Sequence, residues 1–328
     1  MVCLALAAGV IAAVHHAEVV AHRVGEPFGT LILAIAVTVI EVALIVTLMA
    51  SGGDKAATLA RDTVFAAVMI TCNGIVGLAL LVGALRHRVQ DFRVEGSGGA
   101  LAVLAALVTL CLVLPTVTIS APGGTVTPAQ LAFAGFASLA LYCVFVFVQT
   151  VRHRDYFLPV PNKAAPNDEE EHAPAPSTKT SLVSLGLLLV CLVAVVGLAK
   201  TVSPTLESAV ASIGAPLGVV GVAIALLVLM PETLAAVRAA RRDRLQTSLN
   251  LALGSALASI GLTIPALAIA SIWMTGPLVL GLGPTEIVFL VLTMVISMLT
   301  LITRRATVLQ GAVHLLVFSA FLFTAFTP

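Results

Sequence analysis

The sequence predicts an all-α polytopic membrane protein of about ten transmembrane helices, arranged as two inverted five-helix repeats. Of its 328 residues, 59% are hydrophobic and only 10% are charged, whereas a soluble domain carries about 25% charged residues. The apolar residues form runs of about twenty, a length that crosses a bilayer as a helix. Short motifs recur in corresponding runs of the two halves, and they indicate the repeat.

This composition excludes several other classes of protein. A soluble enzyme or a disordered chain would need far more polar residues. With 17 basic against 16 acidic residues, the chain has no basic face for a nucleic acid. The five cysteines lie inside apolar runs without a CxxC pair, so we expect small buried hydrophobic side chains rather than a metal or redox site.

Ten apolar runs are the expected membrane spans. They lie at about 2–21, 28–50, 63–85, 99–120, 129–150, 181–200, 212–236, 246–270, 284–301 and 306–326. A polar segment over residues 151–180, rich in Pro and charge, is expected to be an exposed linker between a first repeat, 1–150, and a second repeat, 181–328. Its acidic run from Asp168 to His172 is typical of a solvated patch, and a weak cation-gathering or regulatory role is the alternative.

The basic residues predict how the chain is oriented. Loops on one side of the membrane collect fourteen of the 17 basic residues, and the other side holds Lys55, Arg61 and Lys200. Lys and Arg in short loops favour the cytoplasm, so we expect a cytoplasmic linker and both chain ends outside. Because five is odd, the second half enters the membrane upside down relative to the first.

Two short motifs relate the halves. GEPFG at Gly25–Gly29 and GAPLG at Gly214–Gly218 each open the second run of their half. In each half an uncharged stretch then leads to a carboxylate, Glu41 or Glu232. The third runs both begin with Arg-Asp and contain one Asn, Asn73 or Asn250.

Glu41 lies near the middle of its run, and no basic residue is near it in sequence. An ionised carboxylate at the bilayer centre costs at least ~2.5–3.5 kcal/mol, so this side chain is either neutral or paired with a cation. A carboxyl group that alternates between these two states couples protons to cations. The alternative is a protonated Glu that only packs, hydrogen-bonded to a neighbouring helix.

Glu232 follows Pro231 directly. Pro lacks an N–H and is expected to break the helix and free backbone carbonyls, and broken helices at membrane depth occur where they line a site. A carboxylate beside free carbonyls suits a hard cation. Because Arg238 follows six residues later, an interfacial position for Glu232 is the alternative.

Other polar residues inside apolar runs are candidates for supporting roles. Neutral oxygen donors that could complete a cation shell, or simply hydrogen-bond between helices, are Thr38, Asn73, Asn250, Ser255 and Ser259. The end of the first run, where a proton relay, a pH sensor, a metal cluster or an ordinary membrane interface are the alternatives, contains His15, His16, Glu18 and His22. His314 is a lone histidine in the last run and a candidate for the same relay or sensing role.

Three long strings resemble the bacterial calcium/proton antiporters of the calcium/cation exchanger superfamily. They are GEPFGTLILAIAVTVIEVALIV, LARDTVFAAVMITCNGIVGLALLVG and PETLAAVRAARRDRLQTSLNLALGSALASIGLTIPALA. The resemblance implies inverted repeats whose motifs meet at mid-membrane, with Glu41 and Glu232 as the essential acidic residues. It also implies a multi-pass protein of the bacterial inner membrane that needs no cofactor. Its partners would be lipid and transported cations, and a homo-oligomer is left open.

One departure from that resemblance concerns the residues before each Glu. In the wider proton-coupled group a Gly-Asn pair stands there, but this chain has Val37–Thr38 and Val228–Leu229. The helix bend and the amide ligands are therefore expected from Pro231, Asn73 and Asn250.

The expected function is export of cytoplasmic Ca²⁺ in exchange for H⁺ by alternating access. Exchange of Na⁺ or K⁺ for H⁺ at the same two-Glu site is the alternative. An intramembrane enzyme is disfavoured, because the sequence has no GxSxG or HExxH motif. A channel, which would conduct current without counter-ion exchange, is also disfavoured.

Overall fold

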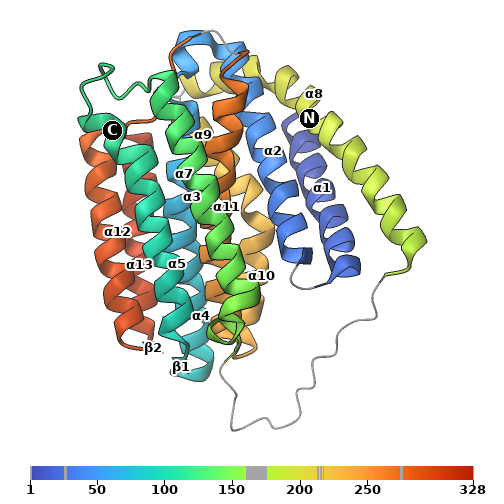
Figure 1. The fold of residues 1–328 in the computed structure, drawn as a ribbon, viewed down its shortest axis with the longest axis vertical. Coiled ribbons are helices and arrows are strands. Elements are labelled where there is room, and N and C mark those ends of the chain that lie inside the picture. Colours follow the sequence, from blue (N-terminus) through green and yellow to red (C-terminus); the bar gives the residue numbers. More distant parts are fainter. Residues whose placement is uncertain are drawn as a thin grey trace.

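The computed structural model describes residues 2–25, 28–159, 176–212, 214, 216, 218–273 and 276–327. The fold is a bundle of long helices, with α1 and α8 as a slanted pair along one side (Figure 1). Among the described residues, nine helices are long and apolar enough to cross a membrane, and one bent pair makes a tenth span. The predicted class and the predicted ten spans are therefore confirmed.

The first half contains five spans. Its elements are α1 (Val2–Val24), α2 (Phe28–Gly52), a 3-10 turn η1 (Gly53–Ala56), α3 (Leu59–Met69), a π-helix η2 (Ile70–Ile75), α4 (Val76–His87), β1 (Gln90–Asp91), α5 (Val94–Val108), a π-helix η3 (Thr109–Val113), α6 (Leu114–Val117), α7 (Pro128–Phe147), a π-helix η4 (Val148–Arg152) and a 3-10 turn η5 (Arg154–Phe157). The third span runs unbroken through α3, η2 and α4, from Leu59 to His87.

The second half also contains five spans. Its elements are α8 (Thr178–Ser212), α9 (Gly218–Val228), α10 (Met230–Arg241), α11 (Leu245–Ala270), α12 (Pro284–Ile302), β2 (Arg305–Ala306) and α13 (Val308–Phe326). The seventh span is broken at Leu229, where α9 and α10 meet at an angle of 51°. The break lies two residues before Pro231, which confirms the break expected there. The sixth span, Thr178–Val202, agrees with the predicted 181–200, and helix α8 continues past it to Ser212.

The packing shows how the repeats interlock. α2 packs against α11 of the other half, while α9 packs against α3, and likewise α7 contacts α11 while α13 contacts α4. The fifth span of each half starts with the same capping box, Thr127 with Gln130 and Thr307 with Gln310. The third span of each half lies at the centre of the bundle. The apolar stretch of that span is 89% buried in the first half and 61% buried in the second half.

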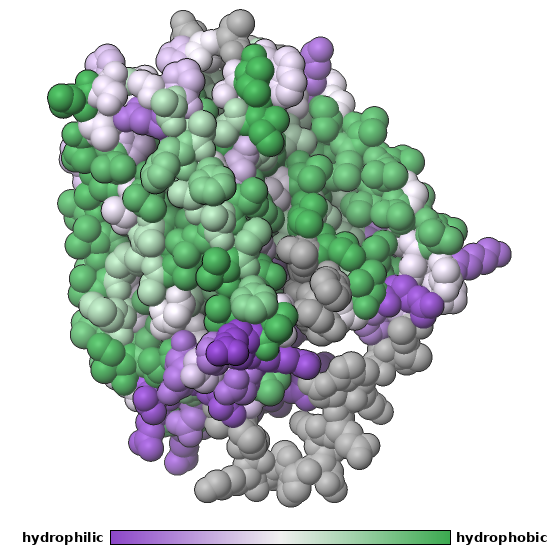
Figure 2. All heavy atoms as spheres, viewed as in Figure 1, coloured by the Kyte–Doolittle hydropathy of each residue, from purple (hydrophilic) through white to green (hydrophobic). Residues whose placement is uncertain are grey.

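The two ends of the bundle differ in polarity. Figure 2 shows a broad apolar belt with hydrophilic side chains gathered at the end that bears β1 and β2 in Figure 1. There β1 pairs with β2 in antiparallel register, Gln90 opposite Ala306. Ion pairs join Arg304 to Glu95 at 3.6 Å and Arg305 to Asp91 at 3.7 Å. The acidic run Asp168–His172 lies outside the described residues, and the expected division at 151–180 stays a prediction.

Candidate ion site

Glu41 is bound across the interface between the two halves. It lies on α2 and is only 3% exposed. The Ser259 hydroxyl of α11 lies 2.7 Å from Glu41 Oε1 and 2.8 Å from Oε2, so it donates to the carboxyl group. A buried carboxyl group from one repeat is thus held by a hydroxyl from the other.

Further hydroxyl groups lie one helical turn from this pair. Thr263 follows Ser259 by four residues on α11 and is fully buried. Its hydroxyl has no hydrogen-bond partner among the described residues, and the four-residue spacing places it on the same face of α11 as Ser259. Ser255 precedes Ser259 by one turn and is half-buried, and Thr38 is buried one turn before Glu41. Sequence reasoning missed Thr263, although its four-residue spacing from Ser259 indicates the same helix face.

Glu232 lies in the first turn of α10, directly after the bend. Its Oε2 atom is buried and has no hydrogen-bond partner among the described residues, and α10 packs against α11, the helix that carries Ser259. Pro231 has no N–H, so the Leu227 carbonyl one turn earlier loses its helical partner. The broken span therefore places an unpaired carboxylate oxygen and a freed carbonyl close together in the chain.

The Asn73 amide is held by partners on α12 and α13. Asn73 is fully buried in η2, where its Nδ2 donates to Thr293 Oγ1 at 2.8 Å. Its Oδ1 lies 3.2 Å from His314 Nδ1. Both polar atoms of this amide are therefore engaged by α12 and α13.

Asn250 is also held elsewhere. Its Nδ2 donates to the Phe157 carbonyl at 2.6 Å, and its Oδ1 accepts from Gln246 at 2.9 Å. Because it precedes Ser259 by nine residues, it lies about 13 Å away along α11. Its amide satisfies a backbone carbonyl of η5 at the end of the bundle, and the structure does not bring it to Glu41.

The histidines of α1 do not form a metal cluster. His15 and Glu18 are exposed, and His16 is half-buried with its ring 5.4 Å from that of His15. No group of three His, Cys, Asp or Glu side chains within the described ranges could hold a metal ion.

Inverted helical repeats with a broken span and buried carboxyl groups are features of secondary ion transporters. The chain belongs to the sodium/calcium exchanger protein family, which matches residues 1–151 and 183–327. It is therefore an antiporter of the calcium/cation exchanger superfamily and a membrane transporter rather than an enzyme. The resemblance noted in the sequence is confirmed.

Two relatives and two solved structures illustrate this membership. The chain is 48% identical to y4hA of Sinorhizobium fredii (strain NBRC 101917 / NGR234), over 98% of this chain and 87% of the relative. It is 36% identical to the sodium-potassium/proton antiporter ChaA of Escherichia coli (strain K12), over 95% and 84%. The structure of native YfkE gives a TM-score of 0.74 at 18% identity, covering 100% of this chain and 91% of that one. The H⁺/Ca²⁺ exchanger CAX gives 0.69 at 15% identity, covering 98% and 80%. At these identities the structures support the fold.

Proposed function

We propose that this protein exports cytoplasmic Ca²⁺ in exchange for H⁺ by alternating access, at one mid-membrane site to which both Glu41 and Glu232 contribute. The observation that supports it most is the buried Glu41 carboxyl group, held by Ser259 of the opposite repeat. The unpaired Glu232 oxygen on the broken span supplies the second half of the site.

Charge balance explains why such a site exchanges ions. Two buried carboxylates are too costly to leave bare in the membrane, so they hold either two protons or one divalent cation. Ca²⁺ takes six to eight oxygen ligands. The carboxylates, the Ser259 and Thr263 hydroxyls and the Leu227 carbonyl offer oxygens of this kind, and water would complete the shell.

The direction of export follows from the expected orientation. The end of the bundle that bears β1, β2 and η5 would face the cytoplasm of a bacterial inner membrane, since it collects the basic loops. Ca²⁺ entering from that end displaces the protons, the loaded protein opens outward, and external protons then displace Ca²⁺.

Exchange of Na⁺ or K⁺ for H⁺ is the second candidate. It is favoured by the 36% identity to a protein named a sodium-potassium/proton antiporter. A monovalent cation balances only one carboxylate, so the other would keep its proton and one H⁺ would move per cation. The two-carboxylate charge match favours Ca²⁺, while the relative favours Na⁺ and K⁺.

Proton flux in everted membrane vesicles tests the proposal. With an imposed pH gradient, Ca²⁺, Na⁺ and K⁺ are titrated in parallel, and the preferred cation is the one that releases protons at the lowest concentration. Glu41→Gln and Glu232→Gln should each abolish that release, while Glu95→Gln, an exposed control, should match wild type. Wild-type exchange in either variant of the proposed site would overturn it.

A further inference from the structure

A second buried polar cluster lies on the far side of the third span from α2. It consists of Asn73 on η2, Thr293 and Thr300 on α12, and His314 on α13. All four side chains are buried, with Asn73, Thr293 and His314 fully so. The proposed ion exchange does not use it directly.

The hydrogen bonds of this cluster form a directed chain. His314 Nε2 lies 3.1 Å from Thr300 Oγ1, and its Nδ1 lies 3.2 Å from Asn73 Oδ1. Because Asn73 donates through Nδ2 to Thr293 at 2.8 Å, its Oδ1 must accept from His314. The imidazole therefore donates through Nδ1 and accepts the Thr300 hydroxyl at Nε2. One ring links three elements, and every partner in the chain is satisfied.

Close helix contacts allow the imidazole to reach Asn73. A Cβ atom on Gly77 would lie 3.0 Å from His314 Cβ, and one on Gly311 would lie 2.5 Å from the Leu81 backbone nitrogen. The backbones of α4 and α13 thus approach closely at His314 and again one turn further along each helix. In addition, η2 is a π-helix, which adds a residue to the turn and changes the face on which later side chains emerge.

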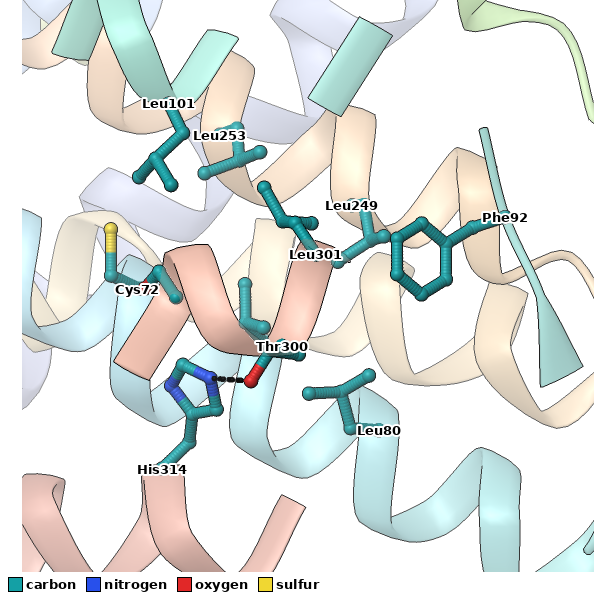
Figure 3. Close-up of a pocket in the computed structure, with 11 residues that line it drawn as sticks. Cys72, Leu80, Phe92, Leu101, Leu249, Leu253, Thr300, Leu301 and His314 are labelled. Atoms are coloured by element: carbon teal, nitrogen blue, oxygen red, sulfur yellow. Dashed lines mark hydrogen bonds between the residues drawn. The ribbon is translucent and has the colours of Figure 1, made fainter. Parts of the chain in front are cut away.

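A small cavity borders the cluster (Figure 3). It has a volume of about 20 Å³, which is room for about one water molecule. His314 and Thr300 line one wall, and Leu249 and Leu253 of α11 line another. Ser297 also lines it, and its buried hydroxyl has no hydrogen-bond partner among the described residues.

We propose that His314 is a positioning residue for ion exchange. By tying Asn73 to α12 and α13, it holds the π-helical turn η2 in place. Because η2 packs directly against α11, this turn in turn sets where α11 presents Ser259 to Glu41. The proposal rests on the proposed function at Glu41.

Substitutions at His314 separate positioning from proton carriage. His314→Leu removes both hydrogen bonds and should raise the apparent KM for the preferred cation about tenfold, as expected when one buried hydrogen bond no longer supports the site. Its maximal rate should stay within about twofold of wild type. His314→Gln has one donor and one acceptor, so it should restore KM to within about threefold. Thr300→Val, which is nearly isosteric, should reproduce the KM effect if His314→Leu fails to fold.

A readout independent of transport completes the test. Hydrogen exchange measured by mass spectrometry at residues 70–77 should quicken in His314→Leu and remain slow in His314→Gln. A wild-type KM together with wild-type hydrogen exchange in His314→Leu would overturn the proposal. A His314→Gln variant as impaired as His314→Leu would also overturn it, because the imidazole ring itself would then be required. If the wild-type protein released no protons in response to any cation, the proposed function would be refuted instead. The hydrogen-exchange rates at residues 70–77 would then decide whether His314 positions η2.

Discussion

Removing the hydroxyl that holds Glu41 is the sharpest local perturbation of the site. Ser259→Ala deletes the only atom of α11 that hydrogen-bonds this carboxyl group among the described contacts, at 2.7 and 2.8 Å. A hydrogen bond to a charged group contributes about 1.5–3 kcal/mol, and about 1.4 kcal/mol is a factor of ten in binding. We therefore expect the apparent KM for the preferred cation to rise roughly 10- to 100-fold.

The assay is the same vesicle proton flux, read as KM and maximal rate, with thermal unfolding in detergent to show that the variant folds. Ser255→Ala is the matched control, because Ser255 lies one turn away on α11 and is half-buried. It should leave KM within about twofold of wild type. A wild-type KM in Ser259→Ala would refute the reasoning, and equal losses in both variants would show general damage to α11.

Three further predictions concern packing and coupling. Gly311→Ala places a Cβ atom 2.5 Å from the Leu81 backbone nitrogen and should lower the unfolding temperature markedly. Gly186→Ala is the control, because Gly186 faces open space, and it should leave the unfolding temperature unchanged. Equal unfolding temperatures of the two variants would contradict the close contact between α4 and α13. Gln90→Ala removes hydrogen bonds to Asp243 at 2.7 Å and to the Ala240 carbonyl at 3.0 Å. It should therefore lower the melting temperature by about 5 °C. The control Asp91→Ala, at the exposed neighbouring residue, should lower it by about 1 °C or less. Lowering the pH on the cation side should raise the apparent KM for Ca²⁺ without changing the maximal rate, because protons and Ca²⁺ use one site. The rise should approach the square of the proton concentration, since two protons compete with one Ca²⁺, and a KM independent of pH would argue for separate sites.

Hydropathy predicted most of the fold because lipid requires every spanning backbone to be helical. Runs of apolar residues located the spans, and Pro231 located the break in the seventh. The sixth span lies within a few residues of its predicted bounds, but helix α8 continues beyond it to Ser212, because Lys200 ends the apolar run and not the helix. A charge marks where lipid ends, whereas helix ends depend on backbone hydrogen bonds.

The site was only partly predictable from the sequence. Glu41 and Ser259 are polar residues isolated in apolar runs, and the structure places them in contact. Asn73 and Asn250 satisfy the same criterion, yet they contact other groups. Asn73 lies within the π-helix η2, where Thr293 of α12 and His314 of α13 engage its amide, partners 220 and 241 residues away in sequence. For Asn250 the partner is the Phe157 carbonyl, 93 residues away in sequence.

The central claim is that one cation is shared by carboxyl groups from the two inverted repeats. Crystals of the protein grown with Ca²⁺ and measured at a long X-ray wavelength would test it through the anomalous difference map. We predict one peak within about 2.3–2.6 Å of an oxygen of Glu41 and of Glu232, with Ser259 beside it. A peak that touches only one of the two carboxyl groups, or lies outside the α2, α10 and α11 contact, would contradict the account.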